Sequence, residues 1–229
     1  MYELFIGNKN YSSWSLRPWV ILRHLGIEFT EHLIPFHDER AWADYRKVAP
    51  NGLVPLLKDG DTLVWDSLAI AEYLAERHDG VWPTDPVARA YARSAAAEMH
   101  SGFSALRNIC GMNIGVRANL RQEHEALNAN LARLATVWSE GLERFGGPFL
   151  AGDKFSAADA FFCPVAFRVQ SYGLQMSPTA MSYAETLFSL PAMQEWAGDG
   201  IAETFRDAPH DAELNEYAEI TQDLRAPAQ

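Results

Sequence analysis

The sequence contains little cysteine, little positive charge and no long apolar run. Only two of its 229 residues are cysteines, Cys110 and Cys163, too few for a disulfide framework or a cysteine-rich metal site. Lysines and arginines number 19 against 30 aspartates and glutamates, which gives a net charge of −11. This balance argues against nucleic acid or an anionic membrane surface as the main partner, but a local basic pocket can still bind a small anion. No apolar run approaches the roughly 18 residues needed to span a bilayer.

Targeting and metal-binding patterns are also missing. Residues 1–6 have no basic segment and no long apolar stretch, so we expect a first strand there rather than a signal peptide, and a cytoplasmic location. The seven histidines are scattered without metal-ligand spacing, which predicts that the protein holds no metal. Hydrophobic residues make up 48% and charged residues 21% of the chain, which is an ordinary balance for a folded globular protein.

The first 78 residues alternate between short strand patterns and helical patterns. One helical pattern ends at Gly26, a typical residue after a helix, and Asp59-Gly60 is a strong hairpin signal. The predicted order is strand 2–6, helix 15–25, strand 28–34, helix 39–48, strands 54–58 and 62–65, and a helix from residue 67. A parallel pair joined by a helix and an antiparallel hairpin backed by another helix form one mixed sheet. This is the thioredoxin-like α/β arrangement.

The character of the chain changes after this region. Residues 79–86 contain two prolines and a glycine, which is typical of a linker between domains. Beyond the linker we expect helices at 88–108, 121–145, 156–172 and 191–205, and a loosely packed polar segment over about the last 20 residues. The predicted organisation is therefore an α/β domain at 1–78, a linker at 79–86 and an all-α domain at 87–229.

Pro55 stands at the start of a predicted strand, directly after Val54. Proline cannot donate to a sheet ladder, so it occupies an edge or the first position of a strand. A cis bond before Pro55 would turn the backbone N–H and C=O of Val54 outward, where they can pair with an extended peptide-like ligand. The alternative is an ordinary trans proline in a turn.

Asp66 and Ser67 open the third predicted helix. Free N–H groups at a helix start bind a carboxylate, the Ser67 hydroxyl adds a donor, and Asp66 can accept from an ammonium group. A site for both groups suits an amino-acid end such as a γ-glutamyl group. The alternative is an ordinary N-cap.

Ser12 and Ser13 lie between the first predicted strand and the first predicted helix. A hydroxyl at this place faces the same edge as Pro55 and the positive end of the helix. It can therefore donate a hydrogen bond that stabilises a thiolate. The alternative is a capping loop, for which Ser15 is a good N-cap.

In this order, the three features resemble the cytosolic glutathione transferase family, and the resemblance covers essentially the whole chain. The C-terminal half adds a capping box at Ser156 and Asp159, similar to that of the family's core helix, followed by Pro164. The pattern Ser-Ser-x-Ser-x-Arg that starts at Ser12 is most similar to the serine-type, zeta-like classes. Trp14 stands where the zeta class carries a cysteine, and the N-terminal half has no cysteine at all, which disfavours a thiol-transfer role.

The resemblance implies which residues bind glutathione. Ser12 is the expected donor to the thiolate, and Ser13 is the alternative. Gly52 occupies the position at which related sequences often carry a lysine, histidine or glutamine that holds the glycyl carboxylate of glutathione. Since glycine has no side chain, His37 or Arg40 is expected to hold that carboxylate instead. The other residues expected to touch glutathione are Trp14, Val54, Pro55, Asp66 and Ser67.

The resemblance also implies an activity. The thiolate of glutathione, the co-substrate, is expected to attack an electrophilic carbon of a small apolar substrate. One alternative is a glutathione-dependent cis–trans isomerase of the maleylacetoacetate type, with Arg168 as the candidate that holds the substrate's carboxylate. Another is a glutathione- or ligand-binding protein without turnover. The expected electrophile pocket consists of Met99, Phe103, Leu106, Arg168 and Tyr172, although the helical spacing of the first three fits a core face equally well.

The family is usually dimeric, and the resemblance therefore implies a homodimer. The stretch at 91–98 is rich in alanine and contains Arg93, and Arg89 lies just before it. Such a stretch suits a contact between helices of two copies. The alternative is internal packing of this helix in a monomer.

Overall fold

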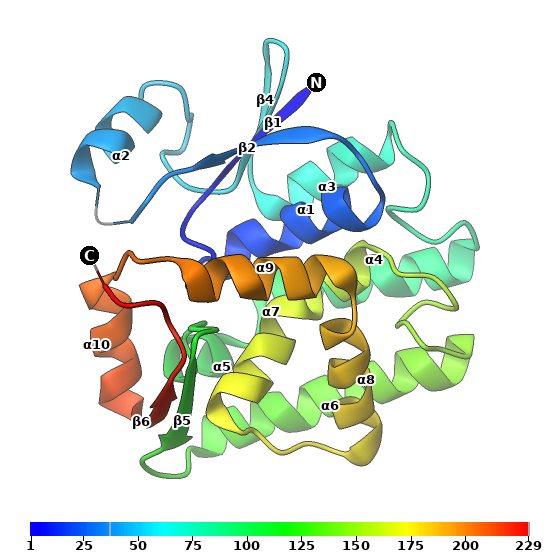
Figure 1. Ribbon diagram of the computed structural model, residues 1–229. Coiled ribbons are helices and arrows are strands. Elements are labelled where there is room, and N and C mark those ends of the chain that lie inside the picture. The colour runs from blue at the N-terminus through cyan, green and yellow to red at the C-terminus, as the bar shows by residue number, and fades with distance from the viewer. Residues whose placement is uncertain (37, 229) are drawn as a thin grey trace.

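The computed structural model describes residues 1–36 and 38–228, so the expectation for His37 lies outside the described residues. A four-stranded sheet with its helices stands on a larger, mostly helical part (Figure 1). Within the described part of the chain, no helix has the length and apolar character required to cross a membrane.

The sheet has the predicted mixed topology. Its strands are β1 (Tyr2–Ile6), β2 (Phe29–Leu33), β3 (Leu56–Asp59) and β4 (Thr62–Val64), in the spatial order β2-β1-β3-β4. β1 pairs with β2 in parallel through the crossover helix α1 (Ser13–His24), and β3 is antiparallel to both β1 and β4. The thioredoxin-like arrangement is thus confirmed.

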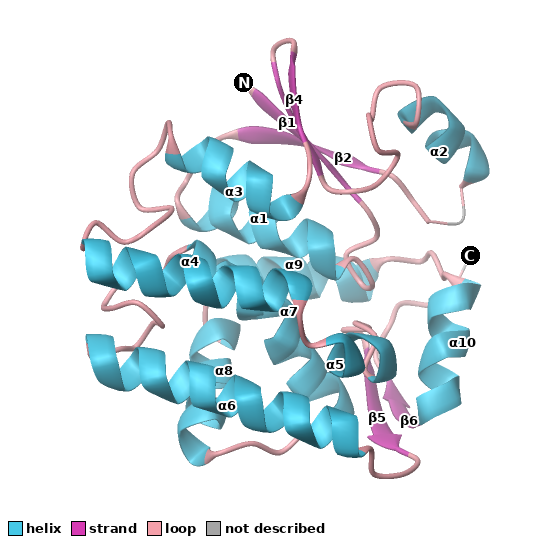
Figure 2. Cartoon of the chain, turned by 180° about the vertical axis from the view of Figure 1, so that it is seen from behind, coloured by secondary structure: helices cyan, strands magenta, loops and turns pink. Residues whose placement is uncertain are grey.

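Alternate residues of the strands face two different cores, because successive side chains of a strand point to opposite faces. Leu4 and Ile6 of β1 pack into the large core that includes α1 and α3 (Ser67–Ala75). Leu56 of β3 and, less deeply, Phe5 of β1 contact the small core under α2 (Glu39–Tyr45), which contains Trp42. The sheet therefore has helices on both faces, with α1 and α3 between it and the helical part (Figure 2).

The helical part is built around α7 (Ala157–Tyr172), of which every residue except Gln170 is buried. Its predicted capping box is present. The Asp159 carboxylate accepts the Ser156 N–H at 2.8 Å, the Leu150 N–H at 2.9 Å and the Tyr183 hydroxyl at 2.8 Å. Burial raises the pKa of Asp159, and these hydrogen bonds oppose that shift. The other helices are α4 (Pro86–Ser101), α5 (Ser104–Ile109), α6 (Glu125–Phe145), α8 (Pro178–Phe188), α9 (Pro191–Ala202) and α10 (Ala208–Tyr217).

The predicted helix at 88–108 is two helices rather than one. The chain breaks at Gly102, where a Cβ atom would come within 2.7 Å of the Glu98 carbonyl oxygen, and at Phe103, which has a positive φ of 55°. α8 and α10 were not among the predicted helices, and α6 begins four residues later than expected, at Glu125.

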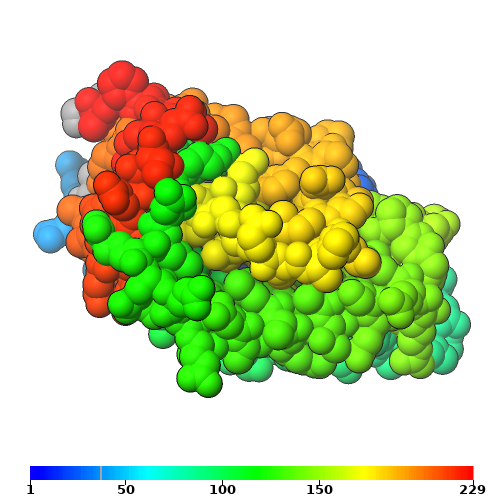
Figure 3. Space-filling model, turned by 90° about the horizontal axis from the view of Figure 1, so that it is seen from below, coloured from blue at the N-terminus to red at the C-terminus, as the bar shows by residue number. Residues whose placement is uncertain are grey.

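The C-terminal segment corrects two further expectations. β5 (Val116–Leu120) pairs in antiparallel fashion with β6 (Ala218–Asp223), so the second part is not purely helical. The last residues are not loosely packed, because β6 is a paired strand and the side chain of Arg225 is buried. Figure 3 shows this C-terminal segment, in red, lying against the green segment that contains β5.

Candidate active site

The loop between β1 and α1 carries the two predicted serines and is held by the far end of the chain. At the end of α9, Glu203 accepts the backbone N–H of Lys9 at 2.6 Å and that of Asn10 at 3.3 Å. The Lys9 carbonyl accepts the indole N–H of Trp196 at 2.9 Å. A buried backbone segment needs such partners for its polar groups, so this loop depends on α9 for its conformation.

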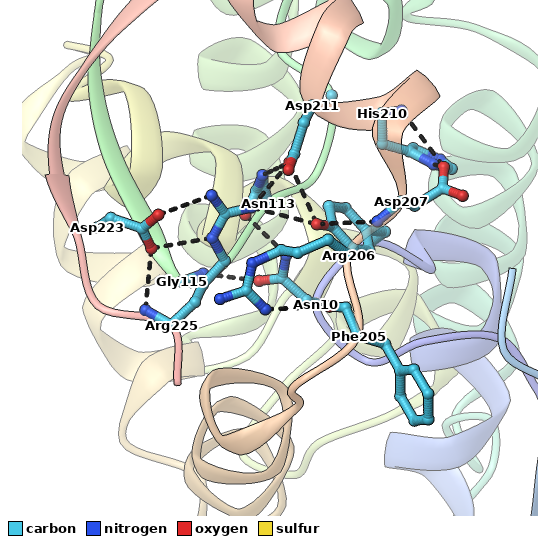
Figure 4. Close-up of polar contacts among 12 residues, drawn as sticks. Asn10, Asn113, Gly115, Phe205, Arg206, Asp207, His210, Asp211, Asp223 and Arg225 are labelled. Carbon is cyan, nitrogen blue, oxygen red and sulfur yellow. Dashed lines mark hydrogen bonds and ion pairs between the residues drawn. The ribbon is translucent and has the colours of Figure 1, made fainter. Parts of the chain in front are cut away.

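A second set of contacts ties the same loop to the residues before β5 and to the C-terminal segment (Figure 4). Asn10 donates to the Asn113 side chain at 2.8 Å and accepts the Gly115 N–H at 2.9 Å. The Tyr11 hydroxyl donates to Asp211 at 3.1 Å and accepts from Arg225 at 3.1 Å. Residues about 200 positions apart in the sequence thus fix the loop that precedes α1.

A cleft of about 470 Å³ opens beside this loop, between α2, α5 and α10. Ser12, Ser13 and Trp14 form one side of it, and Val54 lies at its edge before β3. The remaining lining residues are Tyr11, Phe36, Trp42, Leu53, Arg107, Asn108, Gly111, Met112, Arg168, His210 and Glu213. Aromatic rings and cations make up much of this wall, which suits a ligand with apolar and anionic parts.

The two serine hydroxyls differ in their partners. Ser12 is the residue that precedes α1, and its hydroxyl lies 2.7 Å from the Ser15 hydroxyl. Ser15 in turn accepts the backbone N–H of Gly7 at 3.1 Å. The Ser13 hydroxyl has no hydrogen-bond partner among the residues that the structure describes. Because hydroxyl protons rotate, Ser15 can donate to Ser12 and leave the Ser12 proton free for a ligand.

Two arginines, Arg107 and Arg168, line the cleft although the chain is acidic overall, and a third, Arg17, is buried against Trp14 of the cleft wall. The guanidinium of Arg17 is buried 4.1 Å from the ring centre of Trp14, and that of Arg107 lies 5.3 Å from the same ring. Burial, and then the nearby charges of Arg168 and Arg107, lower the pKa of Arg17 to about 9. Burial likewise lowers the pKa of Arg168 to about 10.

These arginines bond mainly to neutral oxygens. Arg168 donates to the carbonyls of Cys110 at 2.8 Å and Pro164 at 3.2 Å, and Arg107 donates to the His100 carbonyl at 3.2 Å. Within the described residues none of the three forms an ion pair with a carboxylate. The positive charge is therefore uncompensated by direct contact, and it favours a bound anion.

The predicted γ-glutamyl residues Asp66 and Ser67 are not among the residues that line this cleft. Asp66 precedes α3 and accepts the Leu68 N–H at 2.9 Å, while its other oxygen contacts His100 at 3.2 Å. Ser67 is buried and accepts from Arg17 at 3.5 Å. Arg17 thus links the start of α3 to the wall that Trp14 forms. The peptide bond before Pro55 is cis.

The other predicted pocket residues are distributed differently. Met99 and Leu106 are fully buried in the main core, and Phe103 packs there as well, so these three do not line the cleft. Their helical spacing reflects a helix face that packs into the core, which was the alternative to a pocket wall. Tyr172 is buried and donates to the Gly111 carbonyl at 2.8 Å, which places it behind the cleft wall. Arg40 lies exposed on α2 and also lies outside the cleft lining.

Sequence reasoning missed the aromatic and C-terminal parts of the cleft. Phe36 and Trp42 come from the α2 region, and their rings stack with centroids 6.0 Å apart. His210 and Glu213 come from α10, a helix that was not predicted. The proline after Asp207 was the available local signal for α10, since an aspartate followed by a proline in the first helical turn is typical of a helix start. The described residues contain no group of three or more histidines, cysteines or carboxylates that could hold a metal ion.

Comparison with known proteins assigns both halves of the chain to the same family. Residues 11–77 match the family model of the glutathione S-transferase N-terminal domain, and residues 95–191 match that of the C-terminal domain. A probable maleylacetoacetate isomerase 1 of Drosophila melanogaster is 30% identical over 172 residues, covering 72% of this chain and 68% of that protein. Glutathione S-transferase Z1 of Arabidopsis thaliana is 28% identical over 173 residues, covering 73% of this chain and 76% of that protein.

Solved structures agree on the fold. A glutathione transferase homologue from Burkholderia, crystallised with bound glutathione, superposes with a TM-score of 0.64 at 22% identity. It covers 87% of this chain and 97% of its own. The resemblance drawn from the serine loop, Pro55, Asp66 and the capping box is thereby confirmed, and the chain belongs to the glutathione S-transferase family.

Proposed function

We propose that the cleft binds glutathione with its thiol at the serine loop, and that the protein joins the thiolate to a small electrophile. The observation that carries this proposal is the position of Ser12 and Ser13 beside Val54, in one cleft with Arg107 and Arg168, neither of which forms an ion pair among the described residues. Glutathione supplies the peptide backbone that Val54 can pair with and the thiolate that the cations favour.

Ser12 is the proposed donor to the thiolate. In the bound state Ser15 donates to Ser12, and Ser12 donates to the sulfur, so the Gly7 N–H, Ser15 and Ser12 form a continuous chain of hydrogen bonds. Such chains polarise each bond in the series. Each unit by which the thiol pKa falls corresponds to about 1.4 kcal/mol of preference for the thiolate. A charge-assisted hydrogen bond and the nearby start of α1 together supply an effect of this size.

The rest of the tripeptide follows from the elements around the cleft. We assign the cysteinyl backbone to Val54 in the cleft, and the γ-glutamyl group to the start of α3 beyond the cleft lining, where the Asp66 side chain is 45% exposed. The glycyl carboxylate then points toward α2, where Arg40 is the proposed cation among the described residues. Trp14 is half-buried between these regions and limits the access of water to the thiolate.

Two single substitutions test the serine assignment. Ser12→Ala should lower the rate of conjugation to an activated aryl chloride by on the order of 10- to 1000-fold, since it removes the bond to the reacting sulfur. Ser13→Ala is the matched control, because it removes a hydroxyl from the next position of the same loop. Full activity of Ser12→Ala would contradict the assignment. Glutathione binding without turnover of any electrophile would favour a protein that only binds ligands.

A second candidate function is cis–trans isomerisation of an unsaturated acid by the same thiolate. Arg107 and Arg168 favour it, because both line the cleft without a carboxylate partner among the described residues and can hold the carboxylate of a substrate. Arg107→Ala should raise the KM for a carboxylate-bearing cis-enone, with a much smaller effect on an uncharged aryl chloride. Equal effects on both substrates would count against the isomerase.

We further propose a symmetric homodimer of this cytoplasmic protein, with units at 1–78 and 87–229 joined by 79–86. The alanines of α4 do not support the dimer, because Ala88, Ala92 and Ala96 are buried inside the chain. Its support is that relatives of this family pair as dimers, and the exposed apolar side chains of Trp65, at 44%, and Val87, at 51%, are candidates for the contact. Sedimentation at micromolar concentration should give about twice the chain mass of 25.6 kDa, and a species at the chain mass would reject the dimer.

A further inference from the structure

The cleft contains a histidine that the proposed serine mechanism does not use. His210 of α10 lines the cleft together with Ser12 and Ser13, and its Nδ1 atom lies in hydrogen-bond contact with the Asp207 carboxylate (Figure 4). We propose that His210, oriented by Asp207, is a catalytic residue that protonates the electrophile when the thiolate adds to it. This inference rests on the proposed function.

Three residues, Asp207, Tyr11 and Phe36, hold the imidazole ring of His210. Asp207, whose side chain is 9% exposed, holds Nδ1 and also accepts the backbone N–H of His210 at 3.3 Å. The rings of Tyr11 and Phe36 both stack on the imidazole, each with a centroid separation of 5.2 Å and with interplanar angles of 29° and 24°. A ring held at one nitrogen and stacked against two aromatic rings has few orientations left, so its free nitrogen is aimed by the surrounding structure.

The free nitrogen is Nε2. No described residue forms a hydrogen bond with it, and the side chain is 36% exposed, at the cleft. A carboxylate that accepts Nδ1–H sets the tautomer of a histidine and stabilises its doubly protonated form, in which Nε2 carries a transferable proton. The neighbouring Asp211 does not compete for this role, because it accepts from Tyr11, Asn113 and Arg225.

The chemistry that needs such a group is addition to an α,β-unsaturated carbonyl compound. The thiolate forms a C–S bond at the β-carbon, and the π-electron pair moves toward the carbonyl oxygen to give an enolate. His210 gives its Nε2 proton to this enolate and recovers a proton from solvent, which received one when the thiol ionised. The net product is the saturated thioether. Substitution on an aryl chloride expels chloride instead and needs no proton, so the two substrate classes separate the role of His210 from that of the thiolate.

The alternative is a purely structural role, in which Asp207 serves only as the N-cap of α10 and His210 only packs against Tyr11. Asp207→Asn distinguishes the two, because asparagine is an equally good N-cap but lacks the charge that stabilises an imidazolium. His210→Gln retains a polar side chain on the helix and removes the proton donor. His78→Gln is the matched control, since His78 bonds to Tyr2 at the far end of the sheet.

The experiment measures kcat for an uncharged enone and for an activated aryl chloride with each variant, at saturating glutathione. His210→Gln should lower the enone-to-chloride ratio of kcat by on the order of 100-fold. Asp207→Asn should lower it in the same direction, and the solvent isotope effect on the enone reaction should change in His210→Gln. His78→Gln should keep the wild-type ratio. An unchanged ratio in His210→Gln, or equal losses on both substrates, would overturn the role of His210 and leave the transferase proposal standing. If the wild-type protein catalyses neither reaction, both the transferase proposal and the role of His210 are overturned.

Discussion

Removal of the Glu203 carboxylate should destabilise the fold through the serine loop. Glu203→Ala takes the acceptor away from the backbone N–H groups of Lys9 and Asn10, which lie 2.6 and 3.3 Å from it. A buried donor left without a partner costs about 1–3 kcal/mol. Since Glu203 is only partly buried and water can reach some of the vacated space, we expect a loss of about 2–4 kcal/mol for the two together. The loop should also become less ordered, which should weaken glutathione binding.

Urea unfolding followed by tryptophan fluorescence measures this loss, because Trp196 bonds to the same loop. Glu195→Ala is the matched control on α9. It removes a carboxylate that pairs with Arg23 at 3.0 Å on the surface, where both side chains are more than a third exposed. Such pairs contribute about 0.5 kcal/mol or less. Equal stability of Glu203→Ala and Glu195→Ala would refute the idea that the loop depends on Glu203.

The pH dependence of stability gives an independent check on Glu203. Burial raises the pKa of this carboxyl in the folded protein above its ordinary value of 4.5. The folded state therefore binds the proton more tightly than the unfolded state, and stability falls as pH rises from about 4.5 through the raised folded pKa. Glu203→Gln lacks this contribution. The unfolding free energy of the wild type minus that of Glu203→Gln should therefore fall as the pH rises over that range. A value that rises with pH there would contradict the assignment.

Three further predictions concern the frame around the site. Asp159→Asn should lower the unfolding free energy by about 2–4 kcal/mol in urea titrations, because a fully buried acceptor of several hydrogen bonds loses one oxygen. Gly200→Ala should destabilise the fold, since its Cβ would press on the end of the Ile114 side chain at 2.5 Å and on the backbone of Asn10 at 3.1 Å, whereas Gly198→Ala on the same helix meets nothing within 4 Å and should be neutral or stabilising in the same titration. Burial raises the pKa of the Cys110 thiol to about 12 and that of Cys163 well above its usual value, so a thiol reagent at neutral pH should label neither until the protein is unfolded.

Local patterns predicted those parts of the fold that depend on neighbouring residues. The short apolar strand β1, the hairpin turn at Gly60 and the capping box of Ser156 and Asp159 each have a short-range cause, and each is present in the structure. The serine loop was predicted for the same reason, since a strand end followed by a helix start brings a hydroxyl to the edge of a sheet.

The missed features have long-range causes. β5 and β6 are separated by about a hundred residues, and most of the β6 side chains are exposed, so β6 carries no strong pattern of its own. β5 does alternate between apolar and polar residues, but it is only five residues long and its partner lies far along the chain. His210 reaches the cleft only because α10 packs against a loop some 200 residues earlier. Helical spacing could not place Met99 and Leu106, since a core face and a pocket wall have the same period.

Titration of glutathione bound to the protein, followed by the ultraviolet absorbance of the thiolate, tests the central claim most directly. The account predicts that the thiol pKa of bound glutathione lies at least one unit below that of free glutathione, because Ser12 and the arginines at the cleft favour the thiolate. It also predicts that Ser12→Ala moves this pKa back toward the free value, while Ser13→Ala moves it less. Bound glutathione with the pKa of the free thiol in the wild-type protein would contradict the account.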